Sequence, residues 1–315
     1  MQNNNRVYLA GHTGLVGSAI LEELKIEGFT NILTKTHNEL DLLKSQNVEN
    51  FFKTEKPEIV ILAAARVGGI VANNSLPAEF IYENLQIQNN IIHNAYLNGV
   101  KRLLFLGSSC IYPKHSHQPI KEEYLLTGEL EPTNEPYAIA KIAGIKMCQS
   151  YNRQYGTNYI CAMPTNIYGI NDNFHPENSH VIPGLIYKIH NAKTKNEQSV
   201  TIWGTGRPKR EFLNSKDLAI ACLYLLKNYS ENQIINVGSG EEYSIQELAK
   251  IICEVIGYKG NIVFDINKPD GTQRKLLDSS RLEKLGWKKK INLKSGLKDT
   301  YNWFLENISK TLACK

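Results

Sequence analysis

The stretch Arg6-Val-Tyr-Leu-Ala10, followed by Gly11-His-Thr-Gly14-Leu-Val-Gly17, decides the fold. Its apolar run predicts a buried strand, and the amphipathic pattern of residues 15–27 directly afterwards predicts a helix. Three glycines at this spacing allow a tight turn, a close approach of the backbone to a pyrophosphate, and close packing of helix on strand. The phosphates would lie at the N-terminus of the helix. The stretch therefore predicts a dinucleotide site at the end of the first strand.

The alternation of strand and helix continues to about residue 165. Strands are expected at Arg6–Ala10, Ile32–Thr36, Ile59–Ala65, Leu103–Gly107 and Tyr159–Met163, and helices at Leu15–Glu27, Ser45–Lys56, Ala78–Asn98 and Ala138–Tyr155. This pattern is typical of α/β proteins with a doubly wound parallel sheet and helices on both faces. We expect a dinucleotide-binding Rossmann domain over residues 1–165, with later contributions from about 199–237.

Beyond residue 165 the pattern becomes irregular. Helices are expected at about 181–192, 215–228 and 244–256 and from about 297, with strands near Ile234–Val237 and Ile262–Asp265. Ser244-Ile-Gln-Glu247 is a capping box for the third of these helices. We expect residues 166–198 and 238–315 to form a smaller mixed α/β domain that binds the substrate.

Composition limits the classes of protein that this chain can belong to. Its 315 residues are 42% apolar and 21% charged, as in ordinary globular proteins. A net charge of +5 without a run of basic residues favours an anionic small ligand over nucleic acid. The polar start and the absence of a long apolar run predict no signal peptide and no membrane span, hence a cytoplasmic protein. The cysteines form no C-x-x-C pair, and no spacing of ligand residues suggests a metal.

A second stretch, from Gly107 to Lys141, supplies candidate catalytic groups. Ser108 and Cys110 follow a predicted strand, and Tyr137 precedes Lys141 by one helical turn. Residues four apart share a helix face, so the ammonium is expected to favour the phenolate and lower the pKa of Tyr137. A tyrosine in this setting can give a proton to a ketone oxygen as hydride reaches the carbon. With sixteen tyrosines one such pair arises by chance, but the dinucleotide stretch favours catalysis.

The end of the second predicted strand indicates which dinucleotide binds. An acid there usually holds a free ribose 2′-hydroxyl. This chain has Thr34-Lys35-Thr36-His37 instead, and its first acids, Glu39 and Asp41, come later. Lys35 and His37 would suit a 2′-phosphate, so the sequence favours NADP over NAD.

Together these motifs resemble those of the extended short-chain dehydrogenase/reductases. Longer stretches resemble the GDP-L-fucose synthase family, namely residues 107–113, 131–141, 163–169, 172–183 and 268–272. The resemblance spans nearly the whole chain. It implies an NADP(H)-dependent oxidoreductase and isomerase that epimerises a GDP-4-keto-6-deoxy sugar at C3 and C5 and reduces it at C4. It also implies a homodimer that pairs through the helices around 78–98 and 138–155.

The resemblance also assigns roles to individual residues. Ser108 would bind the ketone oxygen beside Tyr137 and Lys141, while Cys110 and His180 would be the base and acid of epimerisation. The implied cofactor contacts are Gly11, His12, Thr13, Gly14, Leu15, Val16, Gly17, Lys35, His37, Leu42, Leu106, Ser109, Lys141, Pro164, Thr165, Asn166, Ile167 and His180. The implied substrate contacts are Lys188, Trp203, Arg210, Asp270 and Lys275. A C4 ketone acidifies the protons on both neighbouring carbons, so one base and one acid near it could invert both centres.

Several alternatives stay open from the sequence. Cys110 could be an inert buried thiol, His180 a helix cap, and Trp203 a core residue. The family often has arginine at the positions of Thr13 and His37 to hold the 2′-phosphate, which leaves the strength of the NADP preference open. Arginine is also typical at the position of Lys188, so a reductase without epimerisation, acting on another GDP-4-keto-6-deoxy sugar such as a heptose, is the main alternative. A non-catalytic dinucleotide-binding protein is a distant one, because Ser108, Tyr137 and Lys141 are intact.

Overall fold

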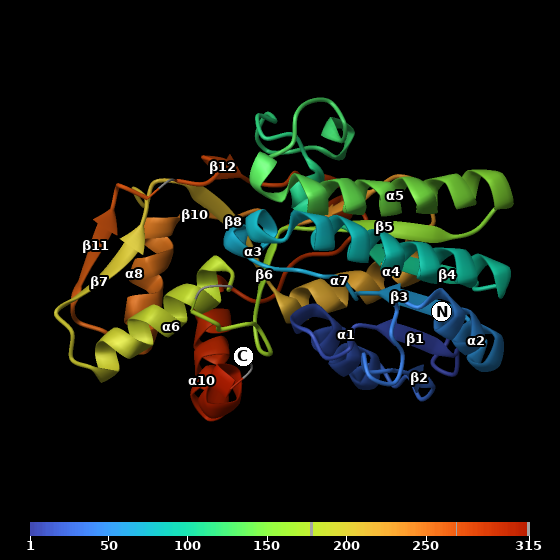
Figure 1. Cartoon of the computed structure of the whole chain (residues 1–315), viewed down its shortest axis with the longest axis horizontal. Helices are drawn as coiled ribbons and strands as arrows, with labels where there is room; N and C mark the ends of the chain where they lie inside the picture. Colours follow the sequence, from blue (N-terminus) through green and yellow to red (C-terminus); the bar gives the residue numbers. More distant parts are fainter. Residues whose placement is uncertain (177–178, 269, 314–315) are drawn as a thin grey trace.

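The computed structural model describes residues 1–176, 179–268 and 270–313. Outside these ranges lie Glu177 and Asn178 of the resembling stretch 172–183, Pro269 of the stretch 268–272, and Cys314. Figure 1 shows a larger half around β1 to β5 and a smaller half around β7, β11, α6, α8 and α10.

A six-stranded parallel sheet forms the centre of the larger half (Figure 1). In order of pairing its strands are β2 (Ile32–Leu33), β1 (Val7–Ala10), β3 (Ile59–Leu62), β4 (Arg102–Leu106), β5 (Tyr159–Pro164) and β9 (Ile235–Val237). The inner strands are buried on both faces, which explains their continuous apolar runs. The strand order changes direction between β1 and β3, and doubly wound sheets bind ligands at such a point, beyond the carboxyl ends of the strands.

Helices cover both faces of this sheet. One face carries α2 (Ser45–Glu55), α4 (Pro77–Leu97) and α5 (Glu135–Tyr155), and the other carries α1 (Leu15–Ile26) and α7 (Ser215–Asn228). Successive side chains of a strand point to opposite faces of the sheet. Val60 therefore packs with the first group of helices and Ile61 with the second. The α/β doubly wound architecture is thus the one that the sequence predicts.

The smaller half contains short strands and three longer helices. β8 (Lys209–Asn214) pairs in parallel with β6 (Asn166–Tyr168) and β12 (Arg274–Lys275), and antiparallel with β10 (Glu242–Ser244). β7 (Ser199–Trp203) pairs with β11 (Asn261–Asp265). The core lies among α6 (Val181–Thr194), α8 (Ile245–Ile256) and α10 (Leu293–Ala313). The expected capping box of α8 is present, since Ser244 and Glu247 bond each other's backbone N–H.

Several short elements differ from the sequence expectation. The periodicity gave no sign of α3 (Ile70–Ser75), α9 (Ser280–Lys284), or the strands β6, β8, β10 and β12. β6, β10 and β12 are only two or three residues long, too short for alternation to be recognised. β8 is six residues long but opens with Lys209, Arg210 and Glu211, so it shows no apolar run. The prediction also lacked β7, which is five residues long. The expected strand at 32–36 is only two residues long, because the chain turns where Glu39 accepts hydrogen bonds from the Thr36 N–H and hydroxyl.

The segment 199–237 is divided between the two halves. α7 and β9 join the larger half, whereas β7 and β8 pair with strands of the smaller half. We propose that the dinucleotide-binding domain takes only the α7–β9 part of this segment. Among the described residues there is no helix long and apolar enough to span a membrane.

Candidate active site

Of the three glycines in the loop after β1, the outer two are tightly packed and the middle one, Gly14, has free space around it. Gly11 has φ +87°, and a Cβ there would lie 2.6 Å from the Ala64 nitrogen, so only glycine fits. A Cβ on Gly17 would lie 2.0 Å from the Gly11 oxygen, which explains the close helix–strand packing. A Cβ on Gly14, by contrast, meets only the Gly11 oxygen at 3.7 Å. Gly14 is also the N-cap of α1 and no side chain caps the helix there, so the loop fits a pyrophosphate.

Basic side chains lie on and after this loop, at His12, Lys35 and His37. His12 Nδ1 is buried, and the described residues offer it no hydrogen bond. Hydrogen bonds from Thr36 lower the pKa of Glu39, with smaller contributions from Lys35 and His12, so both basic side chains lie near Glu39. His37 is exposed, with Nδ1 4.0 Å from a carboxylate oxygen of Asp41. This set of donors fits the phosphate-rich side of a dinucleotide.

Tyr137 and Lys141 lie together on α5. Lys141 is buried, its Nζ donates a 2.8 Å hydrogen bond to the Leu106 carbonyl, and it lies 5.7 Å from the centroid of the Tyr137 ring. Phe80 of α4 contacts the Tyr137 ring edge-to-face at 6.3 Å between centroids. Burial lowers the pKa of Lys141 to about 8.

The prediction that Lys141 lowers the pKa of the Tyr137 phenol is wrong. Burial raises the pKa of Tyr137 above its usual value, and the neighbouring Cys110 adds to the rise. The spacing of Tyr137 and Lys141 predicts the effect of the ammonium on the phenol pKa, but it does not predict that burial removes water from the Tyr137 ring. The phenol consequently stays protonated, as a proton donor must be.

The short helix η1 (Ser109–Ile111) places a thiol beside this pair. Ser108 precedes it, and its Oγ accepts a 3.3 Å hydrogen bond from the Cys110 N–H. Cys110 is only 7% exposed, and burial raises the pKa of its thiol. Lys275 and Lys141 oppose that rise, because both cations favour the thiolate. The structure thus brings Ser108, Cys110, Tyr137 and the two lysines into one place.

His180 lies at the N-terminus of α6. It occupies the N-cap position but makes no side-chain cap bond, so the interpretation of this residue as a helix cap is wrong. His180 as a whole residue is exposed, while the protein atoms around its ring remove enough water to lower its pKa below the usual value.

Two cations of the smaller half face each other across paired strands. Lys275 of β12 is the register partner of Arg210 of β8. Burial lowers the pKa of both side chains, while Glu131 opposes the change in each and Asp270 opposes it in Arg210. Glu131 is bonded to Lys114 at 3.2 Å. Anions of a substrate could displace water from this cationic pair.

Trp203 presents an exposed platform, not a core residue. Its side chain is 56% exposed, with Lys188 Nζ 5.2 Å and Lys268 Nζ 5.4 Å from the ring. Asp270 accepts from the Thr205 N–H at 2.8 Å and from the Thr205 hydroxyl at 2.7 Å, so it orders the turn after the platform. A flat ring between two ammonium groups suits a nucleotide base with nearby phosphates.

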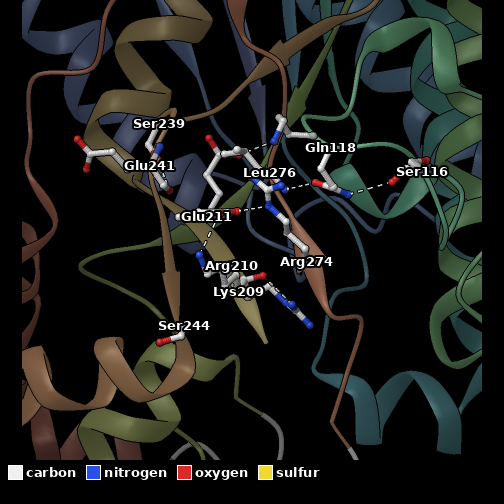
Figure 2. Close-up of polar contacts among 12 residues, drawn as sticks. Ser116, Gln118, Lys209, Arg210, Glu211, Ser239, Glu241, Ser244, Arg274 and Leu276 are labelled. Atoms are coloured by element: carbon white, nitrogen blue, oxygen red, sulfur yellow. Dashed lines mark hydrogen bonds and ion pairs between the residues drawn. The ribbon is translucent and has the colours of Figure 1, made fainter. Parts of the chain in front are cut away.

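The sequence analysis missed three residues of this region. Lys268 contacts the Trp203 ring, Glu131 lies near both Arg210 and Lys275, and Glu211 is a buried carboxylate on β8 (Figure 2). Glu131 and Lys268 begin stretches that carry the family resemblance, which could have drawn attention to them. No sequence signal marks Glu211.

Other expected cofactor residues lie at neighbouring strand ends. Thr165 donates from its hydroxyl to the Glu211 carbonyl at 3.2 Å, and the Asn166 amide donates to the same oxygen at 2.9 Å. Pro164 ends β5 and Ile167 lies in β6.

The remaining expected cofactor residues lie elsewhere. Leu42 packs against the core, and its carbonyl accepts a 2.7 Å hydrogen bond from the side chain of Asn90 on α4. Thr13 is exposed at the loop surface, next to the half-buried Leu15 and Val16.

Comparison with known proteins agrees with this geometry. A family model described as the NAD dependent epimerase/dehydratase family matches residues 7–238. The chain belongs to this family. Its relatives include a putative GDP-L-fucose synthase 2 of Arabidopsis thaliana, 60% identical and covering 98% of this chain and 94% of the relative. GDP-L-fucose synthase of Escherichia coli is 55% identical, with 97% and 98% covered.

A solved structure is also similar to this chain. It is described as a GDP-mannoheptose C4 reductase from Campylobacter jejuni with NADP bound. The two proteins are 44% identical, the TM-score is 0.88, and the match covers 97% of this chain and 99% of the other.

Proposed function

We propose that this chain is an NADP(H)-dependent GDP-L-fucose synthase. It epimerises a GDP-linked 4-keto-6-deoxymannose at C3 and C5 and then reduces C4. The observation that carries the proposal is the gathering of Cys110 with Ser108, Tyr137 and Lys141, because it combines a candidate base with a reductive set. The near-full-length similarity to GDP-L-fucose synthases supports the choice of GDP-sugar.

The cofactor in this proposal is NADP(H), which supplies the hydride when bound. The loop 11–17 would hold the pyrophosphate at the start of α1. Lys35 and His37 would take the 2′-phosphate, and Lys141 the nicotinamide ribose. Residues 164–167, at the end of β5, would line the nicotinamide. The C. jejuni relative with NADP bound supports the choice.

In the reductive step Ser108 and Tyr137 act on the ketone oxygen. The Ser108 hydroxyl donates a hydrogen bond that orients the carbonyl. Burial keeps the Tyr137 phenol protonated, so it can deliver its proton to the oxygen as the carbon is reduced. Lys141, beside the ring, stabilises the phenolate that remains.

In the epimerisation steps Cys110 removes a proton beside the ketone and His180 returns one from the opposite face. A buried thiol is a poor base by itself, since burial raises its pKa. Lys275 and Lys141 reduce this penalty by favouring the thiolate. Burial lowers the pKa of His180, so its protonated form is a stronger acid toward the enolate.

A second candidate function is C4 reduction alone, on another GDP-4-keto-6-deoxy sugar such as a heptose. The similarity to a GDP-mannoheptose C4 reductase supports it. So does Lys188, which lies by the Trp203 platform as a point charge and lacks the two-pronged geometry of an arginine.

One experiment separates the two candidates. The purified protein is given NADPH with GDP-4-keto-6-deoxymannose, or with the corresponding GDP-4-keto-6-deoxyheptose, and the product is analysed by proton NMR. We expect GDP-L-fucose from the first substrate and slow turnover of the second. A product reduced at C4 with C3 and C5 unchanged would contradict the proposal and support the reductase.

We also propose a cytoplasmic homodimer that pairs through α4 and α5. Tyr96 and Tyr155 stack across these helices at 4.2 Å between ring centroids, and Tyr82 of α4 is exposed. Aromatic groups on a helical face suit a self-complementary interface. The cytoplasmic location is supported separately by free thiols such as Cys148 and Cys222, which suit a reducing compartment. The test of the dimer is its mass. Sedimentation should give twice the chain mass, and Tyr82→Glu should shift it toward the monomer.

A further inference from the structure

Glu211 is a fully buried carboxylate in the middle of β8, with 0% of its surface exposed. One oxygen, Oε1, accepts a 2.8 Å hydrogen bond from the Gly240 N–H, and Oε2 accepts a 3.0 Å bond from the Leu277 N–H. Figure 2 shows Glu211 between the loop with Ser239 and Glu241 on one side and, on the other, the segment with Leu276, which is bonded to Gln118 of a further segment. One side chain thus joins three segments that are distant in sequence.

The backbone at Gly238 packs closely against this carboxylate. A Cβ on Gly238 would lie 2.4 Å from Glu211 Oε1, so only glycine fits against it. The Glu211 carbonyl accepts bonds from Thr165 and Asn166, which places the nicotinamide side of the site on the same residue. The Leu276 N–H donates to Gln118 Oε1 at 2.8 Å, which extends the contact to the loop after η1.

Both cations of the candidate substrate site depend on these contacts. Arg210 directly precedes Glu211, and Lys275 lies two residues before Leu277. β12 is only two residues long, so its pairing with β8 gives little stability by itself. Leu276 and Asp278 also share backbone hydrogen bonds with Ile120, at 2.7 and 2.8 Å. The bond from Leu277 to the carboxylate is the one that ties this segment directly to β8, beside the pairing of Lys275 with Arg210.

We propose that Glu211 is a positioning residue that holds Arg210 and Lys275 at the spacing at which they bind the negatively charged part of the GDP-sugar. The inference rests on the proposed function, and it names a residue behind the site that touches neither substrate nor cofactor. Its effect is transmitted through two backbone N–H groups.

The chemistry of the acceptor explains why a carboxylate is needed. Two N–H groups point at Glu211 from different segments, and each carboxylate oxygen accepts one of them. An amide of the same shape has one acceptor oxygen and one donor group. Glu211→Gln therefore leaves one N–H facing another donor and releases one of the two segments.

Asp217 provides a matched control. It is 1% exposed on α7, and its two oxygens accept the Lys290 and Ile291 N–H groups at 3.0 and 2.9 Å. Asp217→Asn therefore breaks the same kind of contact without either candidate cation nearby. Comparing the two variants separates a role in the site from a role in stability.

The experiment measures Kd for GDP-L-fucose and for NADPH by calorimetry, KM for the 4-keto substrate, and Tm. We expect Glu211→Gln to raise Kd for GDP-L-fucose and KM by about tenfold or more, with Kd for NADPH unchanged, because a lost charge-assisted contact has that size. Asp217→Asn should lower Tm and leave all three constants unchanged. Glu211→Asp, which keeps the charge but is one methylene too short to reach both segments, should give the same pattern as Glu211→Gln.

Two results would overturn the inference. One is a Glu211→Gln or Glu211→Asp variant that loses stability but binds GDP-L-fucose as tightly as the unmodified protein. The other is an equal loss of GDP-L-fucose and NADPH binding, which would indicate general disruption. Failure of the unmodified protein to bind GDP-L-fucose would instead reject the proposed function, and the inference with it.

Discussion

The larger half collects its reactive groups from single short stretches, whereas the smaller half assembles its groups from segments far apart in the sequence. Ser108 and Cys110 are two residues apart, and Tyr137 and Lys141 are one helical turn apart. Arg210 and Lys275, by contrast, meet only because β8 pairs with β12. The difference suggests a division of labour in which the larger half performs the reduction and supplies the base Cys110, whereas the smaller half holds the sugar nucleotide and supplies the acid His180. The first two of the following measurements test that division, and the other two test one residue of each half.

The largest effect is expected from Tyr137→Phe, in the larger half. It removes the proton donor and keeps the ring that packs against Phe80. We expect kcat to fall by roughly a hundred- to ten-thousand-fold, as for loss of a general acid, with Kd for GDP-L-fucose unchanged. Steady-state kinetics and calorimetry measure the two quantities. Tyr155→Phe, on the exposed side of the same helix, serves as the control and should leave kcat unchanged.

Arg210→Ala tests the smaller half, where we expect an effect on substrate binding and little effect on kcat. Loss of a charge-assisted contact should raise KM for the 4-keto substrate by about ten- to a hundredfold while kcat changes little. Lys209→Ala changes the neighbouring side chain, which pairs with Glu242 at 3.4 Å, and should leave KM unchanged. If Arg210→Ala lowered kcat as strongly as Tyr137→Phe, the division between the halves would be wrong.

Lys35→Ala tests cofactor choice within the larger half. The unmodified protein should bind NADPH more tightly than NADH, and the variant should lose about tenfold of that preference, because one contact with the 2′-phosphate is removed. Fluorescence titration of both reduced cofactors gives the ratio. Lys25→Ala, in the last turn of α1, is the control. Equal affinities in the unmodified protein would refute the 2′-phosphate site.

The smallest effect concerns stability and pH. Asp172 precedes α6, burial raises the pKa of its carboxyl to about 7, and its Oδ2 has no bond from the described residues. A raised pKa means that the folded chain binds the extra proton, so this contribution to stability is present below about pH 4 and lost as the pH rises to about 7. Asp172→Asn should therefore raise Tm at pH 8 more than at pH 5. A Tm change that is the same at both pH values would contradict this.

The glycine loop and the Tyr137–Lys141 pair were predictable because the spacing of a few residues fixes their chemistry. The pKa of Tyr137 was not, since it depends on burial by Phe80 and other residues from elsewhere in the chain. Lys268 beside Trp203 and Glu211 behind Arg210 were missed for a related reason. Their roles arise from short strands and turns whose pairing leaves no periodic pattern in the sequence.

The central claim is that Cys110 and His180 epimerise the sugar beside an intact reductive set. It is tested most directly by running the reaction in D2O with NADPH and locating deuterium in the product by NMR, with an enzyme-free control for spontaneous exchange. We predict deuterium at C3 and C5 and none at C4, since the hydride carries no deuterium. Cys110→Ser should abolish the exchange and leave slow reduction of the unepimerised ketone. Rapid turnover by the unmodified protein with no deuterium at C3 or C5 would contradict the claim and leave a C4 reductase.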